Sequence, residues 1–116
     1  MKENFAKDLK AHYEALLTGG VFSDVEIVVN VNDKNIKKGS CSVSFIIKKD
    51  DVTRSYTTLY VIERNERANI MYINDNKKEV IFHNNSKNID EGLQKVEKYI
   101  VTYIERCIKK VYGMKI

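Results

Sequence analysis

The chain contains no proline, no tryptophan and only two cysteines. It also lacks long hydrophobic segments: the longest uninterrupted apolar runs, at 59–62 and 70–73, are four residues each. A membrane-spanning helix needs about 20 such residues, so the sequence predicts none. The first residues mix charges of both signs and have no apolar secretory core. We therefore expect a cytoplasmic protein that does not enter a membrane.

The composition is that of one ordinary globular domain covering residues 1–116. Apolar residues make up 43% and charged residues 31% of the chain, which argues against disorder. A length of 116 residues allows one hydrophobic core and is too short for two domains. The missing proline and tryptophan, together with abundant lysine, asparagine and isoleucine, are typical of AT-rich coding sequences, as in low-GC bacteria and their phages and plasmids.

No motif for catalysis or cofactor binding is present. The glycines do not form a phosphate-binding loop, and there is no nucleophile elbow and no H-E-x-x-H. His12, His83, Cys41 and Cys107 are not at the spacings of a zinc site. We therefore expect no metal, no cofactor and no enzymatic activity. Both cysteines lie among apolar residues and are interpreted as small buried hydrophobes, with a disulfide or a reactive thiol as alternatives.

The segment from Asn88 to Gly113 is predicted to be a long helix. Asn88 is a favourable N-cap and is followed three residues later by Glu91, while Lys109 and Lys110 place positive charge in the last turn. Gly113 suits the left-handed position after a helix. The apolar residues that share one helical face are Leu93, Val96, Ile100, Tyr103, Ile104, Cys107 and Val111.

Before this helix, the periodicity predicts one helix and then five strands. The predicted helix covers 3–18, and the predicted strands cover 25–31, 41–48, 53–64, 68–74 and 79–83. Short connections between successive strands favour antiparallel pairing, because parallel pairing needs long crossovers. The expected fold is therefore α+β: a two-layer sandwich in which a five-stranded, mainly antiparallel meander is flanked by both helices.

The chain has more apolar residues than the core of this fold needs. Tyr99, Val101, Ile108 and Tyr112 widen the apolar arc of the last helix. On the sheet, residues that fall on or near the face expected to be wet are Val28, Ile46, Leu59 and Val61. Contiguous exposed apolar surface is typical of contact sites, although isolated exposed hydrophobes are common. The predicted partner-binding residues are Tyr99, Val101, Ile108, Tyr112 and Ile46.

We therefore interpret the chain as a small non-enzymatic protein-binding module that occludes or assembles a protein partner. Homodimerisation is compatible with the same surface. The size and composition also fit a phage- or mobile-element-type inhibitor of a host nuclease or defence complex. An enzyme that uses His12 or His83 would be a third class of function, but no motif supports it.

A nucleic-acid-binding protein is the main alternative. The net charge is +4, and residues 1–63 balance nine positive against nine negative charges, so the excess lies in the later half of the chain. The basic residues of the strand connections and the last helix that would contact phosphates are Lys34, Lys37, Lys38, Lys48, Lys49, Lys77, Lys78, Arg106, Lys109 and Lys110. Tyr56, Tyr60 and Tyr72 would stack on bases if they faced outward. Lysines in turns are also commonly just solvated, and a small-molecule cleft between helix and sheet is a further alternative.

Overall fold

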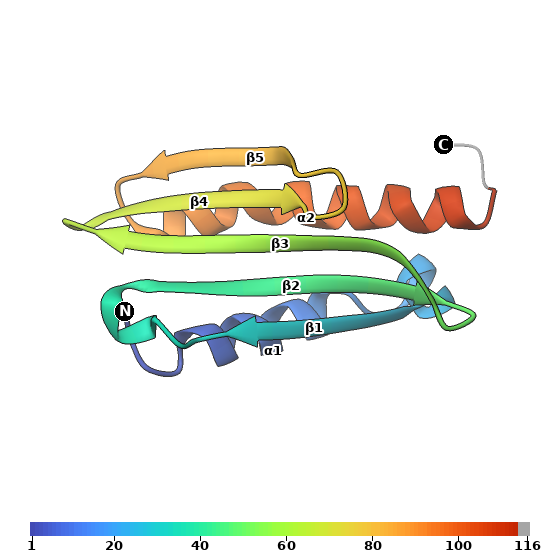
Figure 1. Ribbon diagram of the computed structural model, residues 1–116, viewed down its shortest axis with the longest axis horizontal. Coiled ribbons are helices and arrows are strands. Elements are labelled where there is room, and N and C mark those ends of the chain that lie inside the picture. The colour runs from blue at the N-terminus through green and yellow to red at the C-terminus, as the bar shows by residue number, and fades with distance from the viewer. Residues whose placement is uncertain (114–116) are drawn as a thin grey trace.

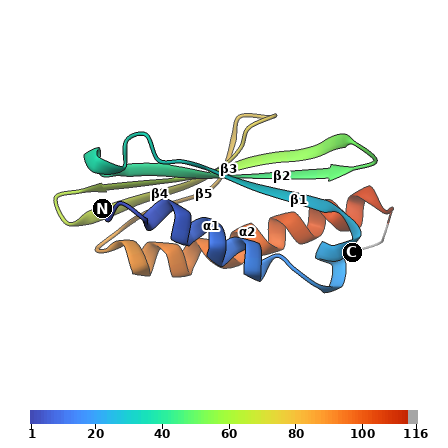
Figure 2. The same ribbon diagram turned by 90° about the horizontal axis from the view of Figure 1, so that it is seen from below.

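Alternating apolar and polar residues build one antiparallel sheet, and two helices pack on one face of it (Figures 1 and 2). The structure is a computed structural model and describes residues 1–113. In chain order the elements are α1 (Phe5–Leu16), the 3-10 turn η1 (Gly20–Asp24), β1 (Glu26–Asn32), the 3-10 turn η2 (Ile36–Lys38), β2 (Ser40–Lys49), β3 (Val52–Arg64), β4 (Arg67–Asn74), β5 (Glu79–Ser86) and α2 (Ile89–Val111).

The strands pair in the order β1-β2-β3-β4-β5, so the predicted five-stranded meander and α+β class are confirmed. Two hairpins turn through residue pairs with positive φ, Asp50 with Asp51 and Asn65 with Glu66. Such left-handed pairs suit the twist of antiparallel strands. The first helix is shorter than predicted at both ends, and β5 runs on to Ser86 instead of ending at 83.

The core lies between the sheet and the helices. The strand residues on the helix-covered face, among them Phe45, Ile47 and Tyr72, are fully buried. Leu59 and Val61 belong to the same face and are also fully buried, so the prediction that they face water is wrong. The prediction failed because aromatic and β-branched residues occupy both faces of β3, so that the period of two is not visible in its sequence.

A series of edge-to-face aromatic contacts joins both helices to the sheet. Tyr13 of α1 contacts Phe45 of β2 with 5.1 Å between ring centroids. Phe45 contacts Tyr72 of β4 at 6.2 Å, and Tyr72 contacts Tyr103 of α2 at 6.0 Å. Each ring pair adds a favourable quadrupole interaction to its apolar burial. The chain of rings therefore fixes α1 and α2 on the same face.

The long helix α2 begins and ends as predicted. The Asn88 side chain accepts a hydrogen bond from the Glu91 backbone N–H at 2.9 Å, and Gly113 has a φ of 67°. The Glu91 carboxylate does not reach back to the cap but pairs with Lys95 at 3.1 Å. Close to its start, Gly92 lies against β4: a Cβ there would be 2.7 Å from Ile70 Cγ1. Glycine at this position lets the helix approach the sheet closely.

No helix in the described part of the chain is both long enough and apolar enough to cross a membrane.

Candidate functional site

No helix of the described chain covers the face of the sheet opposite α1 and α2, although the β1–β2 connection and the β4–β5 turn rise on that side (Figure 2). Its middle rows contain no Lys, Arg, Asp or Glu on any strand. The side chains that alternate with the buried ones and form these rows are Val28, Asn30, Asn32, Ser40, Ser42, Ser44, Ile46, Tyr56, Thr58, Tyr60, Ile62, Asn69, Met71, Ile73, Val80, His83 and Asn85. We call this set of residues the open face.

Apolar exposure concentrates on the open face. Five large hydrophobic residues are exposed in the described chain, and three of them belong to this face: Tyr56 at 36%, Tyr60 at 38% and Val80 at 54%. One acidic side chain enters from the β4–β5 turn, where the Asp75 carboxylate accepts a hydrogen bond from the Thr58 hydroxyl at 2.6 Å. Within residues 1–113, Asp75 is therefore the one acidic residue whose side chain reaches the middle of the open face.

Apart from Asp75, charged residues stand at the two ends of the open face. Glu26 of β1 is opposite Lys48 of β2 at one end, and Arg64 of β3 is opposite Arg67 of β4 at the other. A surface with a charge-poor, partly apolar centre and a polar rim has the composition of a protein–protein interface.

The flank of α2 differs from what the sequence predicts. Ile108 lies on the inner side of α2 and is fully buried. The prediction that it contacts a partner is therefore wrong. Val101 is partly buried and packs on the core. The Tyr112 hydroxyl donates a hydrogen bond to the Asp24 carbonyl of η1, and the ring lies 3.4 Å from Lys49 Nζ. Tyr99 is 43% exposed and is the one large exposed hydrophobic of α2.

A basic cleft lies beneath the C-terminal half of α2. Strand β3 starts at Val52, but β4 ends at Asn74, which pairs with Thr57. The first residues of β3 therefore have no neighbouring strand on the β4 side, and α2 spans the gap. The resulting cavity has a volume of about 870 Å³. It is bordered by Arg54, Ser55, Asn74, Asn76, Lys77, Tyr103, Arg106, Cys107, Lys110 and Val111.

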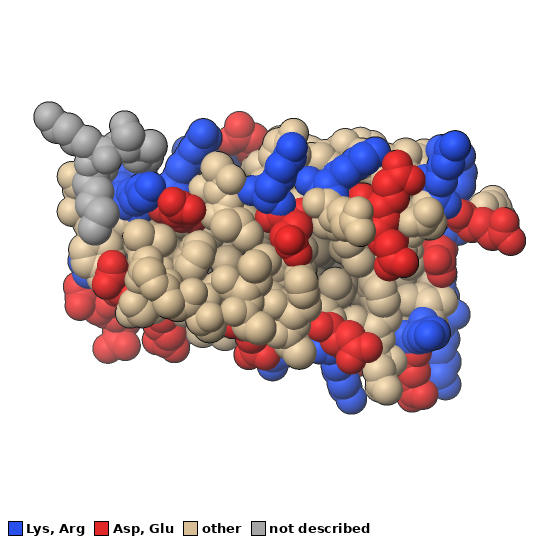
Figure 3. All heavy atoms as spheres, turned by 180° about the vertical axis from the view of Figure 1, so that it is seen from behind, with Lys and Arg blue, Asp and Glu red and all other residues tan. Residues whose placement is uncertain are grey.

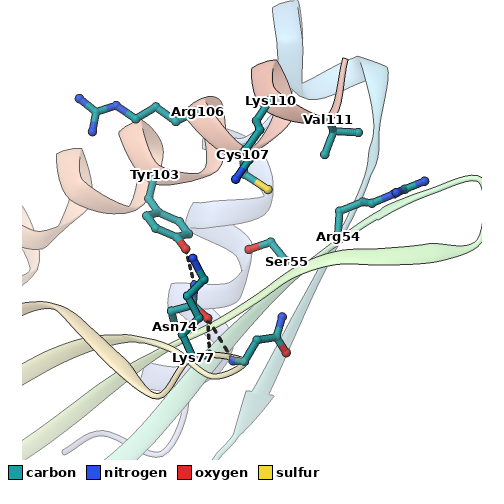
Figure 4. A pocket seen from close by; sticks show the side chains of 10 residues that line it. Arg54, Ser55, Asn74, Lys77, Tyr103, Arg106, Cys107, Lys110 and Val111 are labelled. Atoms are coloured by element: carbon teal, nitrogen blue, oxygen red, sulfur yellow. Dashed lines mark hydrogen bonds between the residues drawn. The ribbon is translucent and has the colours of Figure 1, made fainter. Parts of the chain in front are cut away.

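Buried polar groups hold the walls of this cleft in place. The Asn74 side-chain oxygen accepts hydrogen bonds from the backbone N–H of Asn76 at 3.0 Å and of Lys77 at 3.1 Å. Its Nδ2 donates to the Tyr103 hydroxyl, which joins the β4–β5 turn to α2 (Figure 4). Because the Tyr103 oxygen accepts this bond, its own proton is free to donate to another group.

All charged side chains that border the cleft are cationic. Figure 4 shows Tyr103, Cys107 and Lys110 descending from α2 toward Ser55 and Asn74, with Arg54 and Arg106 at opposite ends. Among residues 1–113, none of Arg54, Lys77, Arg106 and Lys110 forms an ion pair. Seen from the helix side, Lys and Arg gather along the edge where α2 lies (Figure 3).

The meander separates the other predicted basic residues into two groups, as expected. Lys34, Lys37 and Lys38 lie in the β1–β2 connection, at the end of the sheet opposite to the cleft. Lys48, Lys49, Lys77 and Lys78 lie in or beside the turns at the cleft end. Lys109 is engaged with Glu105 at 3.0 Å. Of the predicted nucleic-acid-binding residues, the structure thus brings Lys77, Arg106 and Lys110 together around one cavity.

The histidines and cysteines form no shared site. Both cysteines are free thiols, and burial raises the pKa of Cys41 to about 11. Burial likewise raises the pKa of Cys107, although Ser55 and Lys110 partly oppose the rise. His12 pairs with Glu97 between the helices, and His83 contacts the Asn69 side chain on the open face at 2.7 Å. No group of three or more potential metal ligands occurs within residues 1–113.

The sequence interpretation missed two sets of residues at these surfaces. Met71, Ile73 and Val80 were not predicted on the open face, although the unbroken apolar run at 70–73 is a sign that both faces of a strand are apolar. Arg54 was missed because the cleft depends on β3 being longer than β4. The predicted strands at 53–64 and 68–74 already differ in length, but the sequence does not show that α2 crosses the unpaired start of the longer strand.

Comparison with known proteins adds no identification. No protein-family model matches the chain, and no curated protein and no solved structure matches it. The function is therefore inferred from the two surfaces alone.

Proposed function

We propose that the protein is a non-enzymatic protein-binding module that binds through the open face of its sheet, and that the occupant of this face is a second copy of the chain. The observation that supports this proposal is the charge-poor centre of the open face, where Asp75 is the one charged side chain of the described residues, together with its exposed tyrosines and Val80. Depletion of charge and enrichment of tyrosine and methionine distinguish the core of a protein interface from other surface.

The dimensions of the molecule allow an interface of standard size. Face-on, the whole molecule measures 45 × 24 Å, an outline of about 1,000 Å², and the open face with its charged ends extends along the sheet within it. A standard interface buries roughly 800 Å² on each partner. Two stacked sheets would lie about 10 Å apart and would form a four-layer assembly with the helices outside.

Charge favours a second copy over a polyanion at this surface. Each chain carries a net charge of +4, so two copies repel one another wherever their charged surfaces meet. The open face is where two copies can approach with the fewest like charges together, since Asp75 is the one charged side chain that the described chain places at its middle. A nucleic acid or an anionic membrane would instead find no cation in the middle of the face. The narrower role of a phage-type inhibitor rests on composition and gains no support from these contacts.

The test is the molar mass in solution. A single chain has a mass of 13.5 kDa, and we expect light scattering at about 100 μM protein to give twice that value. The substitution Ile46→Lys places a charge inside the interface, in the row next to its Glu26–Lys48 end, and should return the mass to that of one chain, because burying an unpaired charge costs several kcal/mol.

The matched control is Tyr99→Lys, which adds the same charge on an exposed residue of α2 and should leave the mass doubled. The far-ultraviolet circular dichroism spectrum confirms that both variants are folded. A wild-type mass of one chain at this concentration, or an unchanged mass of the Ile46→Lys variant, would contradict the proposal.

Nucleic-acid binding is the second candidate function. The observation that favours it is the group of unpaired cations at the cleft, reinforced by Lys48 and Lys78 in the turns at the same end of the sheet. Gel-shift measurements with single-stranded and duplex DNA and RNA test it, because affinity should fall steeply between 50 and 200 mM salt when several phosphates are contacted. No shift at low salt would eliminate this candidate.

A further inference from the structure

The basic cleft beneath α2 has the properties of a ligand site that is separate from the open face. Its volume of about 870 Å³ falls within the range of roughly 300–1,000 Å³ that is usual for small-molecule pockets. It lies between α2, the start of β3 and the β4–β5 turn, whereas the open face is on the other side of the sheet. The two surfaces can therefore be occupied independently.

The cations of the cleft are not explained by the stability of α2 alone. Basic residues in a last helical turn interact favourably with the helix dipole, which accounts for Lys109 and Lys110. Arg54 comes from β3 and Lys77 from the β4–β5 turn, so the dipole gives no reason for them. Three separate elements thus deliver positive charge to one cavity, and no acidic side chain borders it within the described chain.

The neutral groups of the cleft also suit an anion. The Tyr103 hydroxyl has a proton to donate after accepting the bond from Asn74. Because burial raises the pKa of Cys107, its thiol is neutral at pH 7 and adds no negative charge to the cavity. Lys77, Lys110 and the Tyr103 hydroxyl therefore border a space that has no competing anion from the described residues, whereas the Arg54 and Arg106 side chains extend outward at its two ends (Figure 4).

The remaining walls are apolar. The Tyr103 ring, the Cys107 thiol and Val111 line the side of the cleft formed by α2. A small inorganic anion would fill only a fraction of this volume and would leave these walls in contact with water. A ligand that combines phosphate groups with a ring would use both the cationic ends and the apolar wall.

We propose that the cleft binds a phosphate-bearing small molecule of mononucleotide size. Its phosphates would lie between Lys77 and Lys110, with Arg54 at the outer end of the cleft, and its ring would lie against Tyr103 and Val111. The cations act as charged hydrogen-bond donors to phosphate oxygens. This inference does not depend on dimerisation through the open face.

The test is isothermal titration at 50 mM salt with three probes: ADP, inorganic pyrophosphate and adenosine. We expect ADP to bind more tightly than pyrophosphate, and adenosine to bind at least tenfold more weakly than ADP. The double substitution Lys77→Gln and Lys110→Gln should weaken ADP binding at least tenfold. Both side chains are exposed, so the fold should persist, as circular dichroism will verify.

The control is the double substitution Lys37→Gln and Lys38→Gln, which removes the same charge at the opposite end of the sheet. It should change the ADP affinity less than twofold. Equal losses in the two double variants would show a general charge effect and overturn the proposal, as would the absence of ADP binding at millimolar concentration. Tighter binding of a single-stranded oligonucleotide than of ADP, with equal sensitivity to both double variants, would assign the cations to nucleic acid instead.

Discussion

Ile46 and Ile47 are neighbours on β2, yet they lie on opposite faces of the sheet in different environments. Ile47 is fully buried under the helices, whereas Ile46 is partly exposed on the open face. The difference arises because successive side chains on a strand point to opposite sides and both helices cover only one of them. Because both residues are isoleucine, the difference in their burial is due to the helices, which cover only one face of the sheet. An apolar open face is then available for a function that the core does not require.

The largest expected effect comes from replacing Ile47 and Ile46, one at a time, by alanine. Ile47→Ala should lower the free energy of unfolding by about 2–5 kcal/mol, because it leaves a cavity in a packed core. Ile46→Ala should lower it by only about 1 kcal/mol, since the side chain is already partly in water. Urea denaturation at low protein concentration, where single chains prevail, measures both values. Equal losses for the two variants would show that the faces are not different.

A second effect tests how closely α2 covers its face. The substitution Gly92→Ala adds a Cβ that would be 2.7 Å from Ile70 Cγ1. Overpacking of this kind costs about 1–3 kcal/mol, which exceeds the gain of up to about 1 kcal/mol from the better helix propensity of alanine. The thermal midpoint should therefore fall. An increase would mean that α2 can move away from β4 without loss.

The pH dependence of stability reports on the groups beneath the helices. Burial raises the pKa of Tyr13 and of Tyr72 well above the usual value near 10, and that of Cys41 to about 11. The unfolded chain then loses these protons first as the pH rises. The contribution to stability is fully present below about pH 9 for the two tyrosines and below about pH 8 for Cys41. It decreases above those values, by up to about 1.4 kcal/mol per pH unit for each group.

Urea denaturation at pH 8.5 and at pH 10.5 measures this change. The urea concentration at which half of the protein is unfolded should be lower at the higher pH. The variant Tyr72→Phe should show a smaller fall than the wild type, because one of the titrating groups is removed. A midpoint that is the same at both pH values would contradict the burial of these groups.

The smallest effect concerns the start of the covering helix. Asn88→Ala removes the acceptor for the Glu91 backbone N–H and should cost about 1 kcal/mol. Asn88→Asp keeps an acceptor and should remain within a few tenths of a kcal/mol of the wild type. A loss in the aspartate variant as large as in the alanine variant would assign the effect to something other than the cap.

The sequence predicts the fold well where one periodicity dominates. In β1 and β2 the alternation is clear, so Ile46 and Val28 were expected on the wet face and are found there. The cap and the glycine end of α2 were likewise predicted. The faces of β3 were ambiguous because a strand that is apolar on both sides has no period, and Ile108 was misplaced because the apolar arc of α2 is wider than its buried face.

The candidate sites were predictable only in part. The separation of the lysines into two ends follows from the meander, which depends on short connections visible in the sequence. The cleft depends on the unequal lengths of β3 and β4 and on the hydrogen bonds of Asn74, a buried amide between two strands. The unequal strand lengths follow from the predicted ranges 53–64 and 68–74, but the hydrogen bonds of Asn74 are tertiary features. No local pattern around Asn74 distinguishes it from an asparagine in an ordinary turn.

The most direct test of the docking surface is a map of backbone amide chemical shifts by nuclear magnetic resonance. Spectra of the wild type at high concentration are compared with those of the Ile46→Lys variant, which serves as the single-chain reference. The account predicts that, beyond the immediate surroundings of residue 46, differences concentrate on the open face at Tyr60, Met71 and Val80 and spare α1 and α2. Differences confined to the neighbours of residue 46, or concentrated on the helices, would contradict it.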